Sequence, residues 1–452
     1  MNEFLCGLTG DIVTPFNQLY NEERQGYNRA VQRFPLIIVY CYSKQDVSNA
    51  VIWARKNCVQ IRIRSGGHNY EGYSNGNFTL VIDVSRMNSM YIDEYSNCLH
   101  VESGVTNAQV YNFVSSKGYP FPGGTCPTVG VSGYALGGGW GLSCRNFGLG
   151  CDSLKGIELV NYEGKIITAN CEINSDLFWA CRGAGGGNFG VILSMIFKLP
   201  QKVDKVTVIN IEYLNVDSEE QAKFMYTWQR WLKTADKRIT LISRVYNSAS
   251  DNLSMLVRGI YYGVPEEALE IIDDFLRLNG AKCNMEYVTF LEAVTIIGSS
   301  YPPYEKFQSA SRFVLRDLTW EDLTKLAGLI TKRPPGSVFA GISMYAMGGR
   351  VSEVETDATA FFYRNAKYII WLETTWEEQQ YAEINRDWIK NQFPKLECMT
   401  DGSYVNFPYK WLDCYKEEYY GKHADILIKI KDKYDPLDVF TFPQGIGIPD
   451  IR

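Results

Sequence analysis

The chain has 452 residues, which is too long for one ordinary hydrophobic core and predicts two or three lobes. Its hydrophobic fraction of 46% and its charged fraction of 21% are typical of a soluble globular protein. The net charge of −6, without any Lys/Arg-rich run, argues against nucleic acid or an anionic membrane as a partner.

The N-terminal stretch lacks the features of a secretory signal. The opening sequence MNEFLCGLTGDIVTPF has no basic segment followed by a long apolar one. No run in the chain approaches the roughly 18 apolar residues of a membrane span. The twelve cysteines show no CxxC pair and no zinc-like spacing, so we expect no metal site. These features predict a cytoplasmic protein with reduced thiols, with export by another route left open.

The first two hundred residues predict a mixture of strands and helices. Residues 35–60 predict a strand, PLIIVYCY, followed by a helix. A second helix is predicted from Thr106 or Asn107 to Gly118. The predicted strands of this lobe are VQIRIRS, FTLVIDVSRM, CLHVESGVT, GIELVNYEGKIITA (with a turn at Glu163 and Gly164) and GVILSMIFKLP. Pro200 ends the lobe.

The composition changes after Pro200. The predicted long strands are VTVINIEYL, ITLISRVY, LSMLVRGIYYG, GISMYAMGG and KYIIWLETTW, with amphipathic helices that include PEEALEIIDDFLRLNG and QYAEINRDWIKNQF. Strand runs interrupted by helices, without strict βαβ alternation, predict an α+β lobe with a mostly antiparallel sheet and covering helices. From about residue 400 the pattern changes again, and HADILIKIKDKYDP predicts a last helix.

The first candidate site is RSGGHNYEG, residues 64–72, at the end of a predicted strand. The two glycines before His68 let the backbone approach a ligand closely. Amides in such a turn form an anion-binding nest, to which Arg64 adds charge. A Gly-Gly turn with a hydrogen-bonded histidine explains this stretch equally well.

The second candidate is GGTCPTVGVSGYALGGGWGLSCRNFG, residues 123–148. So many glycines are not expected to build a helix or strand interior. They are better suited to bringing several backbone segments against a large flat or polyphosphate ligand. Cys126 lies in this loop before Pro127, either as one more buried thiol or as a reactive group.

A third glycine-rich stretch, RGAGGGNFGVILS, matches G-x-G-x-x-G at Gly185, Gly187 and Gly190. The Rossmann fingerprint needs a helix after the glycines, whereas the sequence here predicts a strand, VILSMIFKL. A Rossmann dehydrogenase is therefore excluded. His100 and His423 are predicted to be surface or structural residues.

These three blocks, together with YVNF, YYGKHADILIKIKDKYDP and FPQGI, resemble the berberine bridge enzyme-like family of FAD-linked oxidases. The motifs lie in the family's order at similar distances, and the resemblance covers essentially the whole chain. It implies the vanillyl-alcohol oxidase fold, with a PCMH-type FAD-binding domain split in sequence. The domain would comprise residues 1–200 and a returning segment, 401–452, with a substrate-binding domain at 201–400.

The resemblance also implies roles for individual residues. His68 would bond the flavin 8α-methyl carbon and Cys126 would bond C6, since imidazole and thiolate are competent nucleophiles. Val129 stands where the family tends to have a small residue if dioxygen reaches the flavin, which implies an oxidase. The rest of the cofactor bed would be Arg64, Ser65, Gly66, Gly67, Asn69, Thr125, Gly130, Ser132, Gly133, Gly138, Gly141, Val191, Tyr404 and Asn406.

The sequence departs from the family at the expected catalytic base. Sugar and alcohol oxidases of the family often use a tyrosine at the last place of Y-x-N-Y, where this chain has Phe407. A polar helper usually lies on the strand YIIWLETTW, where the nearest match is Trp371. Period-2 alternation puts Glu373 on the same face as Trp371. The candidate proton acceptors are therefore Tyr70, Tyr404 and Glu373.

The leading hypothesis is an FAD-dependent oxidase with a doubly attached flavin. It would take a hydride from an alcohol carbon, such as the anomeric carbon of a sugar, and release hydrogen peroxide. The alternatives are oxidation of an amine or alkaloid-like substrate, and a flavin-loaded structural or storage protein without turnover. The expected partners are a small-molecule substrate and dioxygen, with no nucleic acid and no membrane, and the protein would be a monomer or homodimer.

Overall fold

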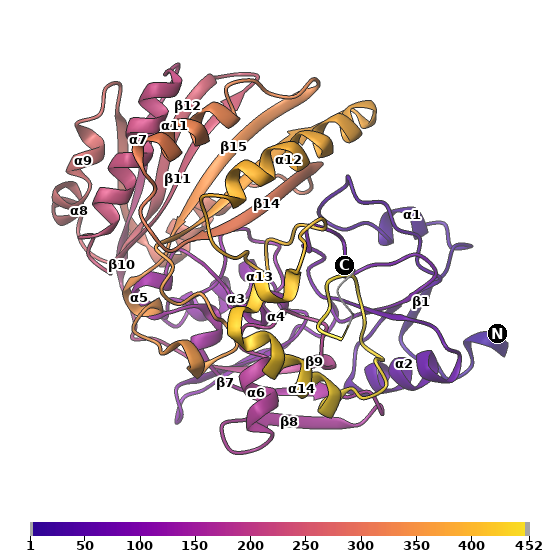
Figure 1. The fold of residues 1–452 in the computed structure, drawn as a ribbon. Coiled ribbons are helices and arrows are strands. Elements are labelled where there is room, and N and C mark those ends of the chain that lie inside the picture. The colour runs from indigo at the N-terminus through magenta and orange to yellow at the C-terminus, as the bar shows by residue number, and fades with distance from the viewer. Residues whose placement is uncertain (1–2, 448–452) are drawn as a thin grey trace.

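Three β-sheets follow one another along the chain, and the computed structural model describes residues 3–447 (Figure 1). The first sheet has the strand order β1-β2-β4-β3. β1 (Asp11–Val13) is antiparallel to β2 (Ile37–Tyr40), whereas β2 and β3 (Ile61–Arg64) are parallel to β4 (Leu80–Asp83). Every residue of β2 and β4 is buried, as expected for parallel strands that are covered on both faces.

Two α-helices accompany this first sheet. They are α1 (Tyr20–Glu23) and α2 (Lys44–Lys56). The side chains of Ser43 and Asp46 form a reciprocal capping box that fixes the start of α2. The predicted strand followed by a helix at 35–60 is therefore confirmed.

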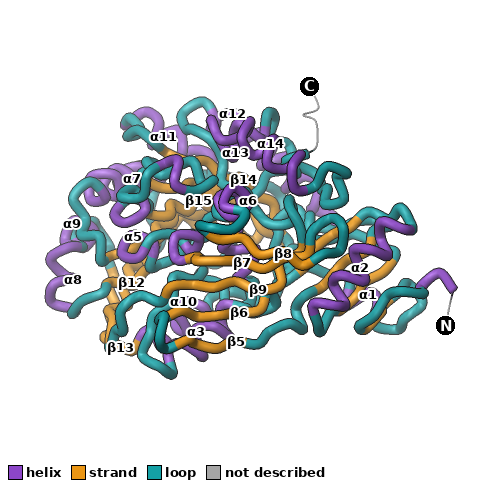
Figure 2. Tube along the Cα trace, turned by 90° about the horizontal axis from the view of Figure 1, so that it is seen from below, coloured by secondary structure: helices purple, strands orange, loops and turns teal. Residues whose placement is uncertain are grey.

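The second sheet is fully antiparallel and has five strands in the order β5-β6-β9-β7-β8. They are β5 (Met90–Asp93), β6 (Cys98–Glu102), β9 (Val191–Lys198), β7 (Leu154–Val160) and β8 (Ile166–Asn170). Figure 2 shows this sheet between α2 on one side and β12 and β13 on the other. β9 is the strand predicted after Gly190, so the argument against a Rossmann site is confirmed.

The helices of this region are α3 (Asn107–Ser115), α4 (Val131–Leu136), α5 (Cys144–Phe147) and α6 (Ser175–Ala180). Thr106 caps α3, as the sequence predicts. The expectation that the glycine-rich region 123–148 would form no helix is wrong, because α4 and α5 lie within it. α4 forms because Val131, Ala135 and Leu136 bury one face of the short helix.

The third sheet has seven antiparallel strands in the order β13-β10-β12-β11-β15-β16-β14. They are β10 (Lys205–Tyr213), β11 (Ile239–Ser248), β12 (Asn252–Tyr261), β13 (Lys282–Thr289), β14 (Phe307–Val314), β15 (Ser337–Ala346) and β16 (Tyr368–Trp376). The predicted α+β class with a mostly antiparallel sheet is confirmed.

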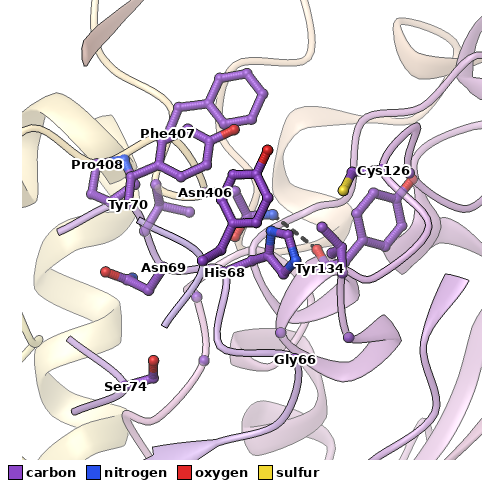
Figure 3. Close-up of a pocket in the computed structure, with 18 of the residues that line it drawn as sticks. Gly66, His68, Asn69, Tyr70, Ser74, Cys126, Tyr134, Asn406, Phe407 and Pro408 are labelled. Atoms are coloured by element: carbon purple, nitrogen blue, oxygen red, sulfur yellow. Dashed lines mark hydrogen bonds between the residues drawn. The ribbon is translucent and has the colours of Figure 1, made fainter. Parts of the chain in front are cut away.

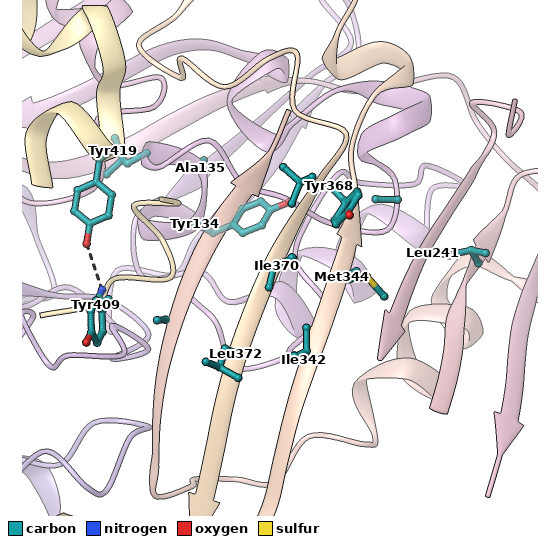
Figure 4. Packing of buried hydrophobic residues seen from close by; sticks show 14 of the residues in the cluster. Tyr134, Ala135, Leu241, Ile342, Met344, Tyr368, Ile370, Leu372, Tyr409 and Tyr419 are labelled. Atoms are coloured by element: carbon teal, nitrogen blue, oxygen red, sulfur yellow. Dashed lines mark hydrogen bonds between the residues drawn. The ribbon is translucent and has the colours of Figure 1, made fainter. Parts of the chain in front are cut away.

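Helices cover one face of the seven-stranded sheet (Figure 1). They are α7 (Ser218–Leu232), α8 (Pro265–Ile271), α9 (Asp273–Leu276), α11 (Trp320–Leu329) and α12 (Ala382–Glu397), whereas α10 (Phe290–Gly298) packs on the opposite face beside α3. Alternate strand residues such as Leu241, Ile342, Met344, Ile370 and Leu372 form the core (Figure 4). The intervening residues of the same strands point to the opposite face.

The helix predicted at 265–279 is two short helices, because the chain leaves helical geometry at Ile272 between α8 and α9.

The C-terminal segment carries α13 (Tyr415–Tyr420) and α14 (Ala424–Tyr434), and α14 packs against α6 (Figure 1). The chain therefore returns to the lobe where it began. None of the helices within residues 3–447 is long and apolar enough to span a membrane.

A buried ion pair ties the loop between β15 and β16 to the region before β7. Arg364 is fully buried and donates two hydrogen bonds, of 2.8 Å and 2.7 Å, to the two carboxylate oxygens of Asp152.

Asp152→Ala should destabilise the fold by about 3–5 kcal/mol, because it leaves the Arg364 guanidinium buried and unpaired. Thermal unfolding measures this loss. Glu353→Ala, which breaks an exposed pair with Lys237, is the control and should cost less than about 1 kcal/mol. Equal effects of the two changes would contradict the prediction.

Candidate active site

A cavity of about 620 Å³ lies where the three sheets and the C-terminal segment meet (Figure 3). Its walls come from residues 61–74, 124–140 and 184–192, from the face of the seven-stranded sheet opposite α7, α11 and α12, from the end of α10 at Ile297, and from residues 404–444. Segments far apart in the sequence therefore line a single space.

His68 and Cys126 meet at one hydroxyl group. The Nε2 atom of His68 lies 2.8 Å from Oγ1 of Thr128, and Sγ of Cys126 lies 3.5 Å from the same oxygen. The imidazole also stacks on the ring of Tyr27, with 4.2 Å between the ring centres. Burial lowers the pKa of His68 to about 4, so the ring is neutral near pH 7. A neutral imidazole keeps the lone pair that a nucleophile needs.

The turn after β3 offers unpaired backbone donors to this cavity. Within the described residues, the amides of Gly66, Gly67, His68 and Asn69 donate to no protein atom, and all four residues line the cavity. The buried Oγ of Ser103, another lining atom, is also without a partner. Consecutive free amides suit a polyanion such as a pyrophosphate.

Gly133 marks open space beside the same turn. It lies in α4 and is exposed to the cavity, and a Cβ added there would meet no atom within 4 Å. Its neighbours Val131, Ser132 and Tyr134 are buried. The free amides and this open backbone fit the bulk and the charge of FAD.

Most of the predicted cofactor and catalytic residues line the cavity. They are Ser65, Gly66, Gly67, His68, Asn69, Tyr70, Thr125, Cys126, Val129, Gly130, Ser132, Gly133, Glu373, Tyr404 and Asn406. Trp371 also lines it, so the predicted shared face of Trp371 and Glu373 on β16 is confirmed.

Four predicted cofactor residues do not line the cavity. Arg64 is ion-paired with Asp83 and donates to the Glu23 carbonyl at 2.8 Å. Val191 is packed in the core of the first lobe. Gly138 and Gly141 permit close packing within the protein: a Cβ on Gly138 would meet the Phe361 ring at 2.6 Å, and one on Gly141 would meet the Gly123 carbonyl oxygen at 1.9 Å. These four residues therefore have packing or ion-pair contacts within the protein, and their contact with the cofactor stays a prediction.

Sequence reasoning missed several lining residues. They are Tyr27, Arg244, Arg258, Tyr301, Glu305, Phe307 and Tyr345. Alternation along β11 and β12 could have placed the two arginines on one face. It could not have shown that this face, rather than the opposite one, bounds the cavity. The prediction for the other histidines holds: His100 stacks on Tyr91, and buried His423 bonds Asp357.

An aromatic cluster forms part of the cavity wall and comprises Tyr70, Phe307, Tyr345, Trp371 and Phe407. Tyr70 stacks on Phe407 with 5.4 Å between ring centres (Figure 3). Trp371 lies 5.6 Å from Tyr70 and 5.7 Å from Phe407, measured between ring centres. The buried Nε1 of Trp371 has no hydrogen-bond partner among the described residues. The wall is therefore mostly aromatic, and the Trp371 Nε1 is a donor available to a ligand.

The three candidate proton acceptors differ in pKa. Burial raises the pKa of Tyr70 well above its ordinary value. Burial also raises the pKa of Tyr404 to about 12, although its hydroxyl oxygen accepts hydrogen bonds from the amides of Gly139 and Trp140 at 3.0 Å and 3.1 Å. Burial raises the pKa of Glu373 to about 8, with Arg244 opposing the shift. Only Glu373 titrates close to neutral pH, the range that suits a general base.

Comparison with known proteins identifies the family of this chain. A model described as "FAD binding domain" matches residues 35–170, and one described as "Berberine and berberine like" matches residues 403–447. An uncharacterised FAD-linked oxidoreductase of Bacillus subtilis, YgaK, is 34% identical over 98% of both chains. The chain belongs to the berberine bridge enzyme-like family of FAD-linked oxidoreductases. It is therefore an enzyme that binds FAD. The two matched segments precede and follow the seven-stranded sheet along the chain.

Solved structures share the fold of this FAD-linked oxidoreductase. The BBE-like 1 protein of Physcomitrella patens superposes with a TM-score of 0.91 at 25% identity and covers 99% of both chains. A chitooligosaccharide oxidase superposes with a TM-score of 0.88 at 24% identity and covers 97% of both chains. The predicted α+β fold of PCMH-type oxidases is confirmed.

Two glycine substitutions should separate cofactor binding from folding. Gly133→Ala adds a methyl group to open cavity space, so we expect a folded protein, within about 1 kcal/mol of the wild type without flavin, but with lower flavin content. Gly141→Ala drives a methyl group into a backbone carbonyl and should cost about 2–3 kcal/mol. The ratio of flavin to protein absorbance and the melting temperature measure the two effects. Full flavin content in Gly133→Ala would contradict the placement of the cofactor.

Proposed function

We propose that this enzyme is an oxidase whose flavin is attached to both His68 and Cys126. It removes a hydride from an alcohol carbon of a sugar-like substrate and releases hydrogen peroxide. Bound FAD would supply the hydride acceptor and pass the electrons to dioxygen. The observation that supports the attachment best is the convergence of the neutral His68 ring and the Cys126 thiol on the Thr128 hydroxyl. Two nucleophiles at one edge of the cavity suit two bonds to a single ring.

The aromatic cluster supports a planar substrate such as a pyranose. Tyr70, Trp371 and Phe407 offer ring faces that can pack against C–H groups and exclude water. The unpartnered Nε1 of Trp371 can donate a hydrogen bond to a substrate hydroxyl. A chitooligosaccharide oxidase shares the fold, so the fold accommodates sugar oxidation.

Glu373 would accept the hydroxyl proton that leaves as the hydride departs. Its Oε1 is buried and makes no hydrogen bond within the described part of the chain. Its raised pKa, about 8, keeps it able to hold a proton near neutral pH. Phe407 has no group that could do so, and the phenols of Tyr70 and Tyr404 are harder to ionise.

Denaturation in acid tests the attachment. The yellow colour should remain with the precipitated wild-type protein, because two covalent bonds survive unfolding. His68→Ala and Cys126→Ala should each retain the flavin through the other bond, and only the double variant should release it. Mass spectrometry of the flavin peptides identifies each link. Colour released from the wild-type protein into the supernatant would overturn double attachment.

A second candidate is the oxidation of an amine. The aromatic cluster can pack against the C–H groups of a neutral amine, and Phe407 matters less because the nitrogen lone pair of a neutral amine supports hydride release without a base. Peroxide release from a panel of sugars, alcohols and amines distinguishes the two candidates. Peroxide from amines alone would replace the alcohol with an amine. No peroxide and no flavin bleaching with any compound would favour a protein without turnover.

Glu373 predicts a pH dependence for the alcohol reaction. A base must be ionised to accept a proton, so kcat should rise with pH through about 8 and level off above it. Glu373→Gln should lower kcat by about 100-fold or more and remove this rise. Glu286→Gln, a change on the exposed edge strand β13, is the control and should leave kcat unchanged. Glu373→Gln with an unaltered pH profile would exclude Glu373 as the base.

A further inference from the structure

We infer that the substrate carries a carboxylate, which binds to Arg244 and Arg258 on the sheet wall of the cavity. This inference rests on the proposed function for the reaction and adds the chemical class of the alcohol that is oxidised. It follows from the placement, the free donors and the charge balance of the two arginines.

The register of two strands puts both arginines on the cavity face. Arg258 of β12 pairs with Ile242 of β11, and Arg244 lies two residues beyond Ile242 on the same strand. Residues that are paired, or two apart, share a face, so both side chains point into the cavity that they line. Diagonal neighbours of this kind are about 7–8 Å apart, a separation that a carboxylate can bridge.

The hydrogen bonds of the arginines leave their terminal nitrogens available. Nε of Arg244 donates to Oγ of Ser343 at 2.8 Å, and Nε of Arg258 donates to Oδ1 of Asn210 at 2.9 Å. These bonds hold each arginine side chain at its Nε atom. Among the described residues, the terminal nitrogens of both groups make no hydrogen bond. Arginine presents these atoms as a fork that matches a carboxylate.

The carboxyl groups of the cavity do not balance this charge. Glu373 lies 3.6 Å from a terminal nitrogen of Arg244, which is an ion-pair distance but too long for a hydrogen bond. Arg258 forms no ion pair within residues 3–447. Glu212 of the neighbouring strand β10 acts on Arg258 electrostatically but, among the described residues, forms no ion pair with it, so the guanidinium lacks an ion-pair partner there.

The ionisation of the other groups increases the imbalance. Burial raises the pKa of Glu373 to about 8 and also raises the pKa of Glu305, so both carboxyl groups favour the protonated form more than an exposed glutamate does. Tyr27, Tyr70, Tyr301 and Tyr345 also face Glu373, and burial raises the pKa of each, so they remain neutral. Both arginines stay charged near pH 7, because a guanidinium keeps its proton in proteins, and they line a cavity whose two carboxyl groups burial shifts toward the neutral form. Such a wall attracts an anion and repels a cationic amine.

Binding of matched acids and amides tests this inference on the flavin-loaded protein. The probes are D-glucuronate with D-glucuronamide, and mandelate with mandelamide, which differ only in the carboxylate. Perturbation of the flavin absorbance spectrum at pH 7 gives each dissociation constant without requiring turnover. At least one acid should bind about 10-fold or more tightly than its amide, as expected for a charge-assisted hydrogen bond.

Variants show whether the arginines cause the preference. Arg258→Met and Arg244→Met should each weaken binding of the acid about 10-fold and leave binding of the amide unchanged. Arg258→Lys, which keeps the charge but loses the fork, should lie in between. Arg350→Met, at an exposed position paired with Glu353, is the matched control and should change nothing. Acids that bind no better than their amides, or an equal loss in the control, would overturn the inference.

The pH dependence of binding adds an independent readout. As pH rises through about 8, Glu373 ionises beside Arg244, so acid affinity should fall, and Glu373→Gln should abolish this fall. A flat profile in the wild-type protein would contradict the effect of Glu373 on the charge near Arg244.

Failure of the two proposals is distinguishable. Acid binding without peroxide release would overturn only the oxidase reaction. Peroxide release from neutral sugars, without a preference for acids, would overturn only the inference that the substrate carries a carboxylate.

Discussion

The active site depends on a contact between two backbones that leaves no room for side chains. A Cβ on Gly66 would meet the amide nitrogen of Gly130 at 2.4 Å, and one on Gly130 would meet Oγ of Ser65 at 2.4 Å. This contact holds the turn after β3 against the start of α4. It therefore sets the positions of His68 and Cys126, each a few residues from the contact. Any larger residue at either glycine would separate the two nucleophiles and open the cavity wall between them.

Much of the fold could be predicted because its elements follow local rules. The capped helix α3 and the strand β9 after Gly190 follow from end signals and period-2 alternation, which need no knowledge of distant residues. The helix α4 could not be predicted from glycine content, because its stability comes from burial of Val131 and Leu136. Propensity is a weak guide where tertiary packing determines the outcome. The break at Ile272 has no comparable sequence signal.

The two sides of the candidate site were predictable to different degrees. On the flavin side, glycines and the His68 and Cys126 motifs identify the segments directly. They do not reveal that Arg64, a charged residue beside the ligand loop, is paired within its own sheet with Asp83. On the substrate side, Glu373 follows from alternation. Arg244 and Arg258 depend on the pairing of β11 with β12 and on which face bounds the cavity, and a single sequence specifies neither.

This difference has a physical cause that bears on how the enzyme selects its substrate. The flavin side consists of close backbone contacts, so nearly every change there affects folding or cofactor binding. The substrate wall consists of side chains at alternate positions of a sheet whose core lies on its other face, so these side chains can change at little cost to the fold. Trp371 and Glu373 on β16 are side chains of this kind. In the proposed reaction, the phenols of the aromatic wall are hard to ionise, so the polar roles are assigned to Glu373 and the two arginines. The charge that a substrate must present then follows from those three residues rather than from the family fold.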